Sequence, residues 1–312
     1  MANKEKNFVS SIIYVHNAEK RLERFLKTII DVMETNFEHS EIICVNDSSD
    51  DNSAEIIKNI SEKAVSSSIS VVNMSFFHGL ELSMNAGIDL AIGDFVFEFD
   101  NTVLDFKPDV IMDIYRKSLE GFDIVSASSD RKEKITSKLF YRVYDRYSNL
   151  SYKISTESFR VLSRRVINRV DAMNKSIPYR KIVYANCGLK TANIRYEALN
   201  LSKEGADKKE RKFRSGLAMD SLILFTEMGY SFAKAMTILM MLMSVLMIVY
   251  SVVIYATAHP VEGWTTTILF LSVAFFGLFG ILTVVIKYLQ LLVNLVFKRK
   301  QYTYESIEKL TK

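Results

Sequence analysis

The sequence predicts an α/β domain with a mostly parallel sheet, followed by two membrane-spanning helices. Up to about residue 230, segments rich in β-branched and aromatic residues alternate with segments whose apolar residues recur at helical spacing. Two long stretches without any charged residue follow. Alternating strands and helices favour an open, mostly parallel sheet, and uncharged stretches longer than about 20 residues favour helices that cross a bilayer.

The expected elements of the α/β domain follow one another along the first 129 residues. Strands are expected at residues 8–15, 41–47, 68–76, 94–100 and 122–129. Helices are expected between them, at residues 18–37, 48–65, 79–93 and 107–121. Ligands of such sheets bind where the strands end, which points to residues 16–17, 46–47 and Asp100.

The next segments are basic. Residues 136–150 and 158–173 are expected to form helices rich in arginine, and residues 181–197 one or two strands. The stretch KEGADKKERKFR at residues 203–214 carries six bases against three acids. It is either a solvated linker or a patch that faces anionic lipid headgroups or a phosphate, and both alternatives stay open.

The uncharged stretches cover residues 235–258 and 265–286, and each is long enough to span a bilayer. Lysine and arginine flank the pair on the sides of both chain ends, whereas the loop HPVEGW between them has none. The positive-inside rule therefore predicts a plasma (inner) membrane protein of multi-pass type, with its soluble domain and both termini in the cytosol. The expected divisions are a cytosolic domain (1–214), an amphipathic juxtamembrane segment (215–234), a two-helix hairpin (235–297) and a cytosolic tail (298–312).

Composition excludes several classes of protein. The two cysteines, Cys44 and Cys187, cannot build a disulfide framework or a zinc site and fit a reducing compartment. No phosphate-binding P-loop, dinucleotide fingerprint or hydrolase nucleophile motif is present. The net charge of +4 is mild, and two membrane spans make nucleic-acid binding an unfavourable interpretation.

Acids at strand ends, together with many arginines, favour phosphate chemistry. Asp47 either contacts a ribose or base or only caps the next helix. Asp100 either ligates a divalent cation that bridges a diphosphate or is only a turn residue. Arginine side chains are well suited to hold a phosphate, although a solvated helix face is the favoured interpretation for any one of them taken alone; the candidates are Arg131, Arg142, Arg146 and Arg160.

Taken in order, five segments resemble the family 2 glycosyltransferases, most nearly the dolichyl- or polyprenyl-phosphate sugar synthases of the bactoprenol glucosyl transferase type. They read VSSIIYVHNAE, VNDSSDDNS, FEFDNTVLDFKPD, TSKLFYRVYDRYS and SFRVLSRRV. With the two C-terminal uncharged stretches, the resemblance covers nearly the whole chain. It implies a GT-A nucleotide-sugar-binding domain with a mostly parallel mixed sheet, and transfer of a sugar to a polyprenyl (undecaprenyl or dolichyl) phosphate with Mg²⁺ or Mn²⁺ on the diphosphate.

The resemblance also assigns roles to individual positions. Nucleotide-sugar binding falls on Asn17, Asp47, Asp100 and Thr102. Catalytic roles fall on Asp100, Arg131 and Arg160, with Asp100 as the metal ligand. The lipid phosphate would be held by Arg142, Arg160 and Lys212. A homo-oligomer is expected from the resemblance alone.

The chain departs from the family pattern where the metal would bind. The second Asp of the D-x-D motif is Thr102, and the Gln that follows two residues later is Leu104. Loss of one carboxylate from a two-carboxylate site predicts weak metal binding. Two main hypotheses follow: a membrane-bound hexosyltransferase that supplies polysaccharide biosynthesis in the cell envelope, and a catalytically weakened homologue that serves as a membrane scaffold or binding protein. A third, with a lipid-linked saccharide as acceptor, is less favoured. A processive synthase is disfavoured, because no Q-x-x-R-W motif is present.

Overall fold

The computed structural model describes residues 4–131, 157–172, 180–199, 264–297 and 302–311, together with residues 235, 236, 239, 240, 242, 243 and 246. The described residues fall into two compact units. One contains the N-terminal α/β domain together with the C-terminal residues from 300 onward, and the other contains residues 219–299.

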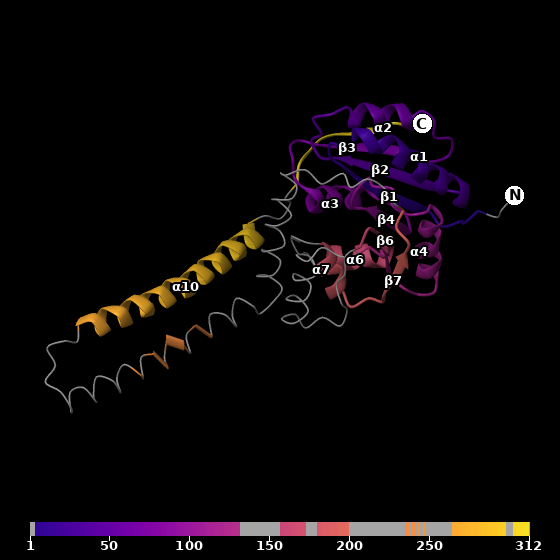
Figure 1. Ribbon diagram of the computed structural model, residues 1–312. Coiled ribbons are helices and arrows are strands. Elements are labelled where there is room, and N and C mark those ends of the chain that lie inside the picture. Colours follow the sequence, from indigo (N-terminus) through magenta and orange to yellow (C-terminus); the bar gives the residue numbers. More distant parts are fainter. Residues whose placement is uncertain are drawn as a thin grey trace. The chain divides into compact units, whose positions relative to one another are not determined.

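The first unit is built on an eight-stranded mixed sheet in the order β7-β5-β6-β4-β1-β2-β3-β8 (Figure 1). Its strands are β1 (Val9–Val15), β2 (Ser40–Asn46), β3 (Ser68–Met74), β4 (Phe95–Phe99), β5 (Ile124–Ser129), β6 (Phe159–Ser163), β7 (Thr191–Tyr196) and β8 (Tyr304–Lys309). The strands β4, β1, β2 and β3 run parallel, as do β5 and β7, whereas β6 and β8 are antiparallel to their neighbours. The predicted mostly parallel α/β sheet is confirmed.

Helices cover both faces of the sheet. One face packs against α1 (Glu19–Asn36), α2 (Ser53–Ser61) and α4 (Asp109–Leu119) in the largest apolar cluster. The other packs against α3 (Leu80–Leu90), α6 (Arg164–Ala172) and α7 (Arg180–Asn186). Gly87 lets α3 approach the sheet closely, because a Cβ atom there would lie 2.5 Å from the Ile12 side chain.

Two predicted elements are partly wrong. The expected helix at residues 158–173 is a strand followed by a helix, β6 and then α6, and the side chains of Phe159 and Arg160 in β6 are almost fully buried. The expected strands at residues 181–197 are a helix, α7, followed by the single strand β7. A short apolar run such as residues 159–163 fits the spacing of a helix and of a strand equally well. It forms a strand here because β6 pairs with β4 on one side and β5 on the other.

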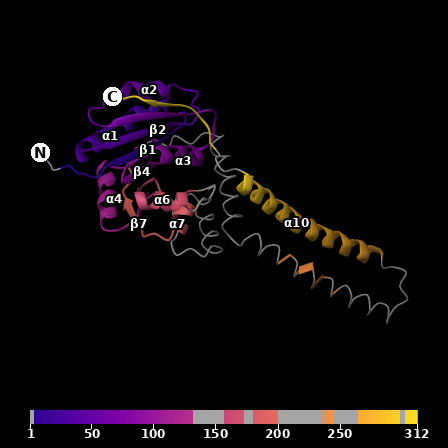
Figure 2. The same cartoon turned by 180° about the vertical axis from the view of Figure 1, so that it is seen from behind.

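The predicted cytosolic tail contains an element that the sequence reasoning missed. β8 forms the edge of the sheet, antiparallel to β3, and both views show the C-terminal segment running along this edge (Figures 1 and 2). The Thr303 backbone N–H donates to His78 Nε2 at 3.1 Å, and the Ile69 N–H donates to Thr311 Oγ1 at 2.7 Å. The chain therefore returns to its first domain after the apolar stretches.

The second unit contains α10 (Trp264–Phe297), a helix of 34 residues. Gly277 on this helix lies against Met240, since a Cβ atom there would come within 2.5 Å of Met240 Cε. No helix in the described part of the chain proved long and apolar enough to cross a membrane. Most of the first predicted span, residues 235–258, lies outside the described residues, as do the predicted helix at 136–150 and the segments 203–214 and 215–234.

Candidate functional site

Asp100 directly follows β4, a central strand of the sheet. It therefore lies at the carboxyl ends of the strands, where a ligand is predicted to bind. β4 is paired with β1 on one side and with β6 on the other. The residue is 7% exposed. The predicted position at a strand end is confirmed, and the carboxylate contacts charged side chains of two other elements.

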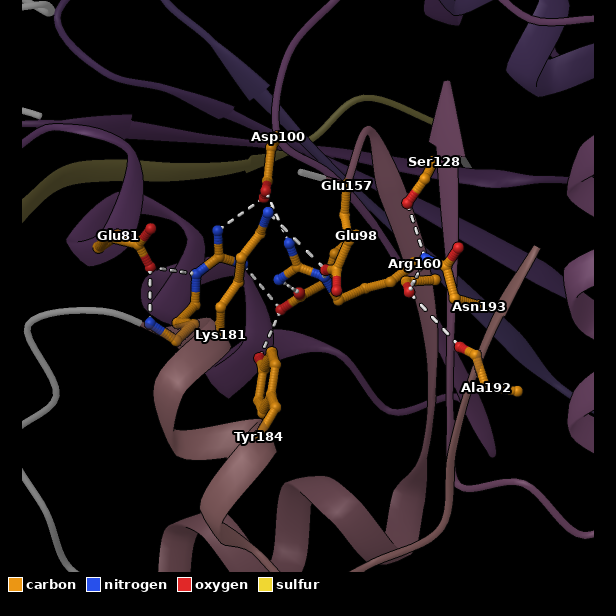
Figure 3. Close-up of polar contacts among 12 residues, drawn as sticks. Glu81, Glu98, Asp100, Ser128, Glu157, Arg160, Lys181, Tyr184, Ala192 and Asn193 are labelled. Carbon is orange, nitrogen blue, oxygen red and sulfur yellow. Dashed lines mark hydrogen bonds and ion pairs between the residues drawn. The ribbon is translucent and has the colours of Figure 1, made fainter. Parts of the chain in front are cut away.

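Arg160 reaches Asp100 from β6. It is the register partner of Glu98 across the antiparallel pair of β4 and β6. Its Nη1 lies 2.8 Å from Glu98 Oε2, its Nη2 2.8 Å from Asp100 Oδ2, and its Nε 3.2 Å from Glu157 Oε2. Figure 3 shows the guanidinium lying among these carboxylates. Each nitrogen of Arg160 therefore faces an acid.

Arg180 reaches the same carboxylates from the start of α7. Its Nε lies 2.9 Å from Glu81 Oε2, its Nη1 2.8 Å from Glu98 Oε1, and its Nη2 2.7 Å from Asp100 Oδ1. The Tyr184 hydroxyl donates to Glu98 Oε1 at 2.7 Å (Figure 3). Both oxygens of Asp100 and both oxygens of Glu98 are thus engaged by guanidinium groups.

The charges of this network nearly balance in the protein interior. The cations face a larger number of acids, and the members are Arg160, Arg180, Lys181, Glu81, Glu98, Asp100 and Glu157. Burial alone would raise the pKa of Asp100, but the charges of Arg160 and Arg180 outweigh it and hold that pKa well below its usual range. Asp100 is therefore ionised at neutral pH and held as the anion of an ion-pair network.

The residues that would complete a metal site do not fit one. Thr102 is 1% exposed, and its Oγ1 accepts a hydrogen bond from Arg21 Nε of α1 at 2.7 Å. Leu104 packs into the apolar core. Within the described ranges, no three His, Cys, Asp or Glu side chains are grouped so as to hold a metal ion. Mg²⁺ prefers several open oxygen ligands, which Asp100 with a neutral, hydrogen-bonded Thr102 does not supply.

Asp47 follows β2 and is fully buried. It accepts from the Tyr14 hydroxyl at 2.9 Å and from the backbone N–H groups of His78 and Gly79, both at 2.8 Å. These bonds fix the turn before α3, where Gly79 has a φ of 81°. The alternative that Asp47 caps the following helix is wrong, because its carboxylate binds the start of α3 and not that of α2.

Asn17 lies beside the segment that follows Asp47. Its Oδ1 accepts from the Asp50 N–H at 2.9 Å, and its own N–H donates to Ser49 Oγ at 3.1 Å. Asn17 and Ser48 both have positive φ angles, 46° and 50°. The predicted nucleotide positions at the ends of β1 and β2 are therefore brought together, and their role in binding stays a prediction.

Of the predicted arginines, the structure describes Arg131 and Arg160 and does not bring them together. Arg131 lies apart from the Asp100 network, with its Nη1 3.7 Å from Asp105 Oδ2 and its Nη2 donating to the Leu199 carbonyl. Arg142, Arg146 and Lys212 lie outside the described residues. Arg160 is buried in the network and has almost no exposed surface that could contact a lipid phosphate. Its predicted contact with the lipid phosphate stays a prediction.

Sequence reasoning missed Glu81, Glu98, Arg180, Tyr184 and Arg21. Glu98 offered a signal, because a carboxylate inside the apolar strand FVFEF requires a cationic partner when it is buried. The sequence did not reveal which arginines fill that role, since they come from elements 62 and 82 residues further along the chain.

Comparison with known proteins decides the family. The sequence model of the glycosyl transferase family 2 matches residues 10–171. This range includes all four residues predicted to bind the nucleotide-sugar. The chain belongs to the family 2 glycosyltransferases. It is similar to an uncharacterized glycosyltransferase of Synechocystis sp., with 28% identity over 195 residues, 61% of this chain and 60% of the relative.

This glycosyltransferase is also similar to a prophage bactoprenol glucosyl transferase homolog of Escherichia coli, with 30% identity over 196 residues. That match covers 60% of this chain and 62% of the relative, so both matches span less than two thirds of the relatives' own lengths. Among solved structures, a mannosyltransferase from Pyrobaculum calidifontis in complex with GDP-Man and Mn²⁺ has a TM-score of 0.51 at 14% identity. It covers 74% of this chain and 64% of that chain, and it confirms the GT-A type of fold.

Proposed function

We propose that this family 2 glycosyltransferase transfers a hexose-type sugar from a nucleotide-sugar to a polyprenyl phosphate, and that the product supplies cell-envelope glycan synthesis. The observation that carries the proposal is the match of the family over residues 10–171, together with the similarity to a bactoprenol glucosyl transferase homolog.

The geometry supports a reaction driven by positioning. A lipid phosphate is already an anion and needs no strong general base, so the protein has to orient the acceptor and stabilise the departing diphosphate. The ends of β1, β2 and β4 place Asn17, Asp47 and Asp100 along one edge of the sheet. The charges around Asp100 are buried and held by ion pairs, and pre-positioned charges are what such stabilisation requires.

A membrane location is part of the proposal, with the enzyme domain and both chain ends in the cytosol. β8 and β3 belong to one sheet, so the chain between them begins and ends in the same compartment, and we propose that it crosses the membrane twice, as a two-helix hairpin. α10 exposes large apolar side chains three and four residues apart, at Leu271, Phe275, Leu278, Leu282, Val285, Leu289 and Leu292. An exposed apolar stripe of this length supports an apolar environment for α10, and we propose that lipid acyl chains provide it.

A second candidate function has its own support. Both acids that the family would use for the donor, Asp47 and Asp100, are saturated by hydrogen bonds and ion pairs from the protein itself. A homologue that has lost turnover and retains the fold would serve as a membrane scaffold or binding protein. The structure of the sheet would be unchanged in that case, so only an assay separates the candidates.

The test is a transfer assay with the full-length chain in detergent micelles. Polyprenyl phosphate is supplied with each of a panel of UDP-, GDP- and TDP-sugars, and sugar radiolabel is measured in the organic phase. The proposal expects labelled lipid with at least one donor. Absence of transfer with the whole panel, in EDTA and in Mn²⁺ alike, would favour the scaffold. A cysteine placed in the 259–264 loop should react with an impermeant reagent from outside the cell, and labelling only after lysis would reverse the proposed orientation.

A further inference from the structure

At the end of β4, the carboxylate of Asp100 faces two arginines, whereas in a metal site it would face a cation from solution. A divalent cation needs carboxylate oxygens that are open to it. Asp100 Oδ1 lies 2.7 Å from Arg180 Nη2, and Asp100 Oδ2 lies 2.8 Å from Arg160 Nη2. Two fixed cations at these distances repel a dication, so Asp100 is committed to the protein's own arginines.

The next position of the motif has lost its negative charge and lies beside an arginine. A metal-binding motif with two Asp residues would place its second carboxylate where Thr102 stands, but Thr102 is neutral and accepts from Arg21 Nε at 2.7 Å. Arg21 lies in the first turn of α1 and is half-buried. The chain therefore brings a permanent positive charge to the position where the motif would have a negative one.

Burial separates the roles of the three arginines. The side chains of Arg160 and Arg180 are 1% and 2% exposed, and each of their nitrogens faces a protein carboxylate. They hold Asp100 through Arg160 Nη2 and Arg180 Nη2, and Arg160 Nε and Arg180 Nη1 are buried at ion-pair distance from acids without a hydrogen bond. Arg21 is only partly buried, so of these three arginines it is the one that a dissolved anion can approach.

We propose that this site binds the diphosphate of its donor without a divalent cation. Arg21 meets the phosphates and supplies the positive charge that a metal would otherwise bring, while Arg160 and Arg180 keep Asp100 out of metal coordination. The ligand class is a nucleoside diphosphate and its sugar ester. This inference rests on the proposed function, because it assumes a nucleotide-sugar donor. Guanidinium groups suit this role, since they form charge-assisted hydrogen bonds with phosphate oxygens.

The test measures binding of UDP, GDP and TDP to the full-length chain in detergent by calorimetry, once in EDTA and once in Mn²⁺. We expect at least one nucleotide to bind in EDTA with an affinity that Mn²⁺ changes by less than about twofold. Arg21→Gln, which keeps a donor for Thr102, should weaken binding at least about tenfold, the effect expected for loss of a charge-assisted hydrogen bond. Arg24→Gln is the matched control, because Arg24 is exposed on the same helix and should leave binding unchanged.

A second readout needs no variant and no turnover. Titration of the wild-type protein with Mn²⁺, followed by electron paramagnetic resonance, should reveal no stoichiometric site that Asp100→Asn removes. Binding of nucleotide only in Mn²⁺, such an Asp100-dependent Mn²⁺ site, or unchanged affinity in a folded Arg21→Gln protein would each overturn the inference while the proposed function stands. Failure of every nucleotide to bind in either condition would overturn both.

Discussion

Glu98 and Arg160 face each other across the antiparallel pair of β4 and β6, with Arg160 Nη1 2.8 Å from Glu98 Oε2. Both side chains are almost completely excluded from solvent, at 0% and 1% exposure. A buried ion pair contributes little relative to an apolar pair, but removal of one partner leaves the other charged and desolvated. We therefore expect the network at the end of β4 to contribute to the stability of the fold as well as to the site.

Replacement of Arg160 by Met should destabilise the domain strongly. The change leaves Glu98, Asp100 and Glu157 short of a cation, and breaking a buried pair in this way costs about 3–5 kcal/mol. Denaturant unfolding of the full chain in detergent measures the effect. Arg116→Gln is the control, since Arg116 pairs with Asp113 at the surface, where the two side chains are 67% and 52% exposed, and its loss should change the midpoint little. Equal effects of the two substitutions would contradict the assigned role of Arg160.

Removal of the Tyr184 hydroxyl tests the network without removing a charge. Tyr184→Phe deletes the hydrogen bond donated to Glu98 at 2.7 Å, while both arginines remain in place. A hydrogen bond to a charged group contributes about 1.5–3 kcal/mol, so the free energy of unfolding should fall by that amount. An unchanged free energy of unfolding would show that this bond is not formed in solution.

The stability of the network should depend on acid in a defined direction. The pKa of Asp100 is depressed in the folded state, because its arginine partners outweigh the effect of burial. Its stabilising contribution is therefore present above about pH 4, the ordinary range of a carboxyl, and is lost as the pH falls toward the depressed folded value. The stability difference between wild type and Asp100→Asn should accordingly be constant from pH 7 to pH 5 and shrink below pH 4. A difference that grows in acid would contradict this assignment.

Truncation after residue 301 should weaken the first domain, although it removes no residue of the Asp100 network. The deletion takes away β8 and exposes the backbone edge of β3, along with the bond from the Thr303 N–H to His78. Each lost hydrogen bond costs roughly 0.5–1.5 kcal/mol, and an exposed edge promotes association. Thermal unfolding and size-exclusion chromatography measure the two effects. Glu308→Gln removes only an exposed ion pair with Lys58 and should be nearly neutral.

The sequence carried the alternation of strands and helices from β1 to β5, and it located Asp47 and Asp100 at strand ends. The sequence did not reveal which side chains pair with Asp100. Arg180 is 80 residues away in the chain, and only the packing of α7 on the sheet brings it to the carboxylate. β8 escaped notice because YESIEK is a short polar edge strand, whose identity depends on the neighbouring β3 and not on its own apolar pattern.

The most direct test of this account is an experimental structure of the full-length chain with a nucleoside diphosphate in Mn²⁺, with anomalous scattering data collected for manganese. We expect both guanidinium groups on the oxygens of Asp100, no manganese peak at coordination distance from that carboxylate, and phosphate density in contact with Arg21. A manganese peak between Asp100 and the diphosphate, with Arg160 or Arg180 displaced, would contradict it.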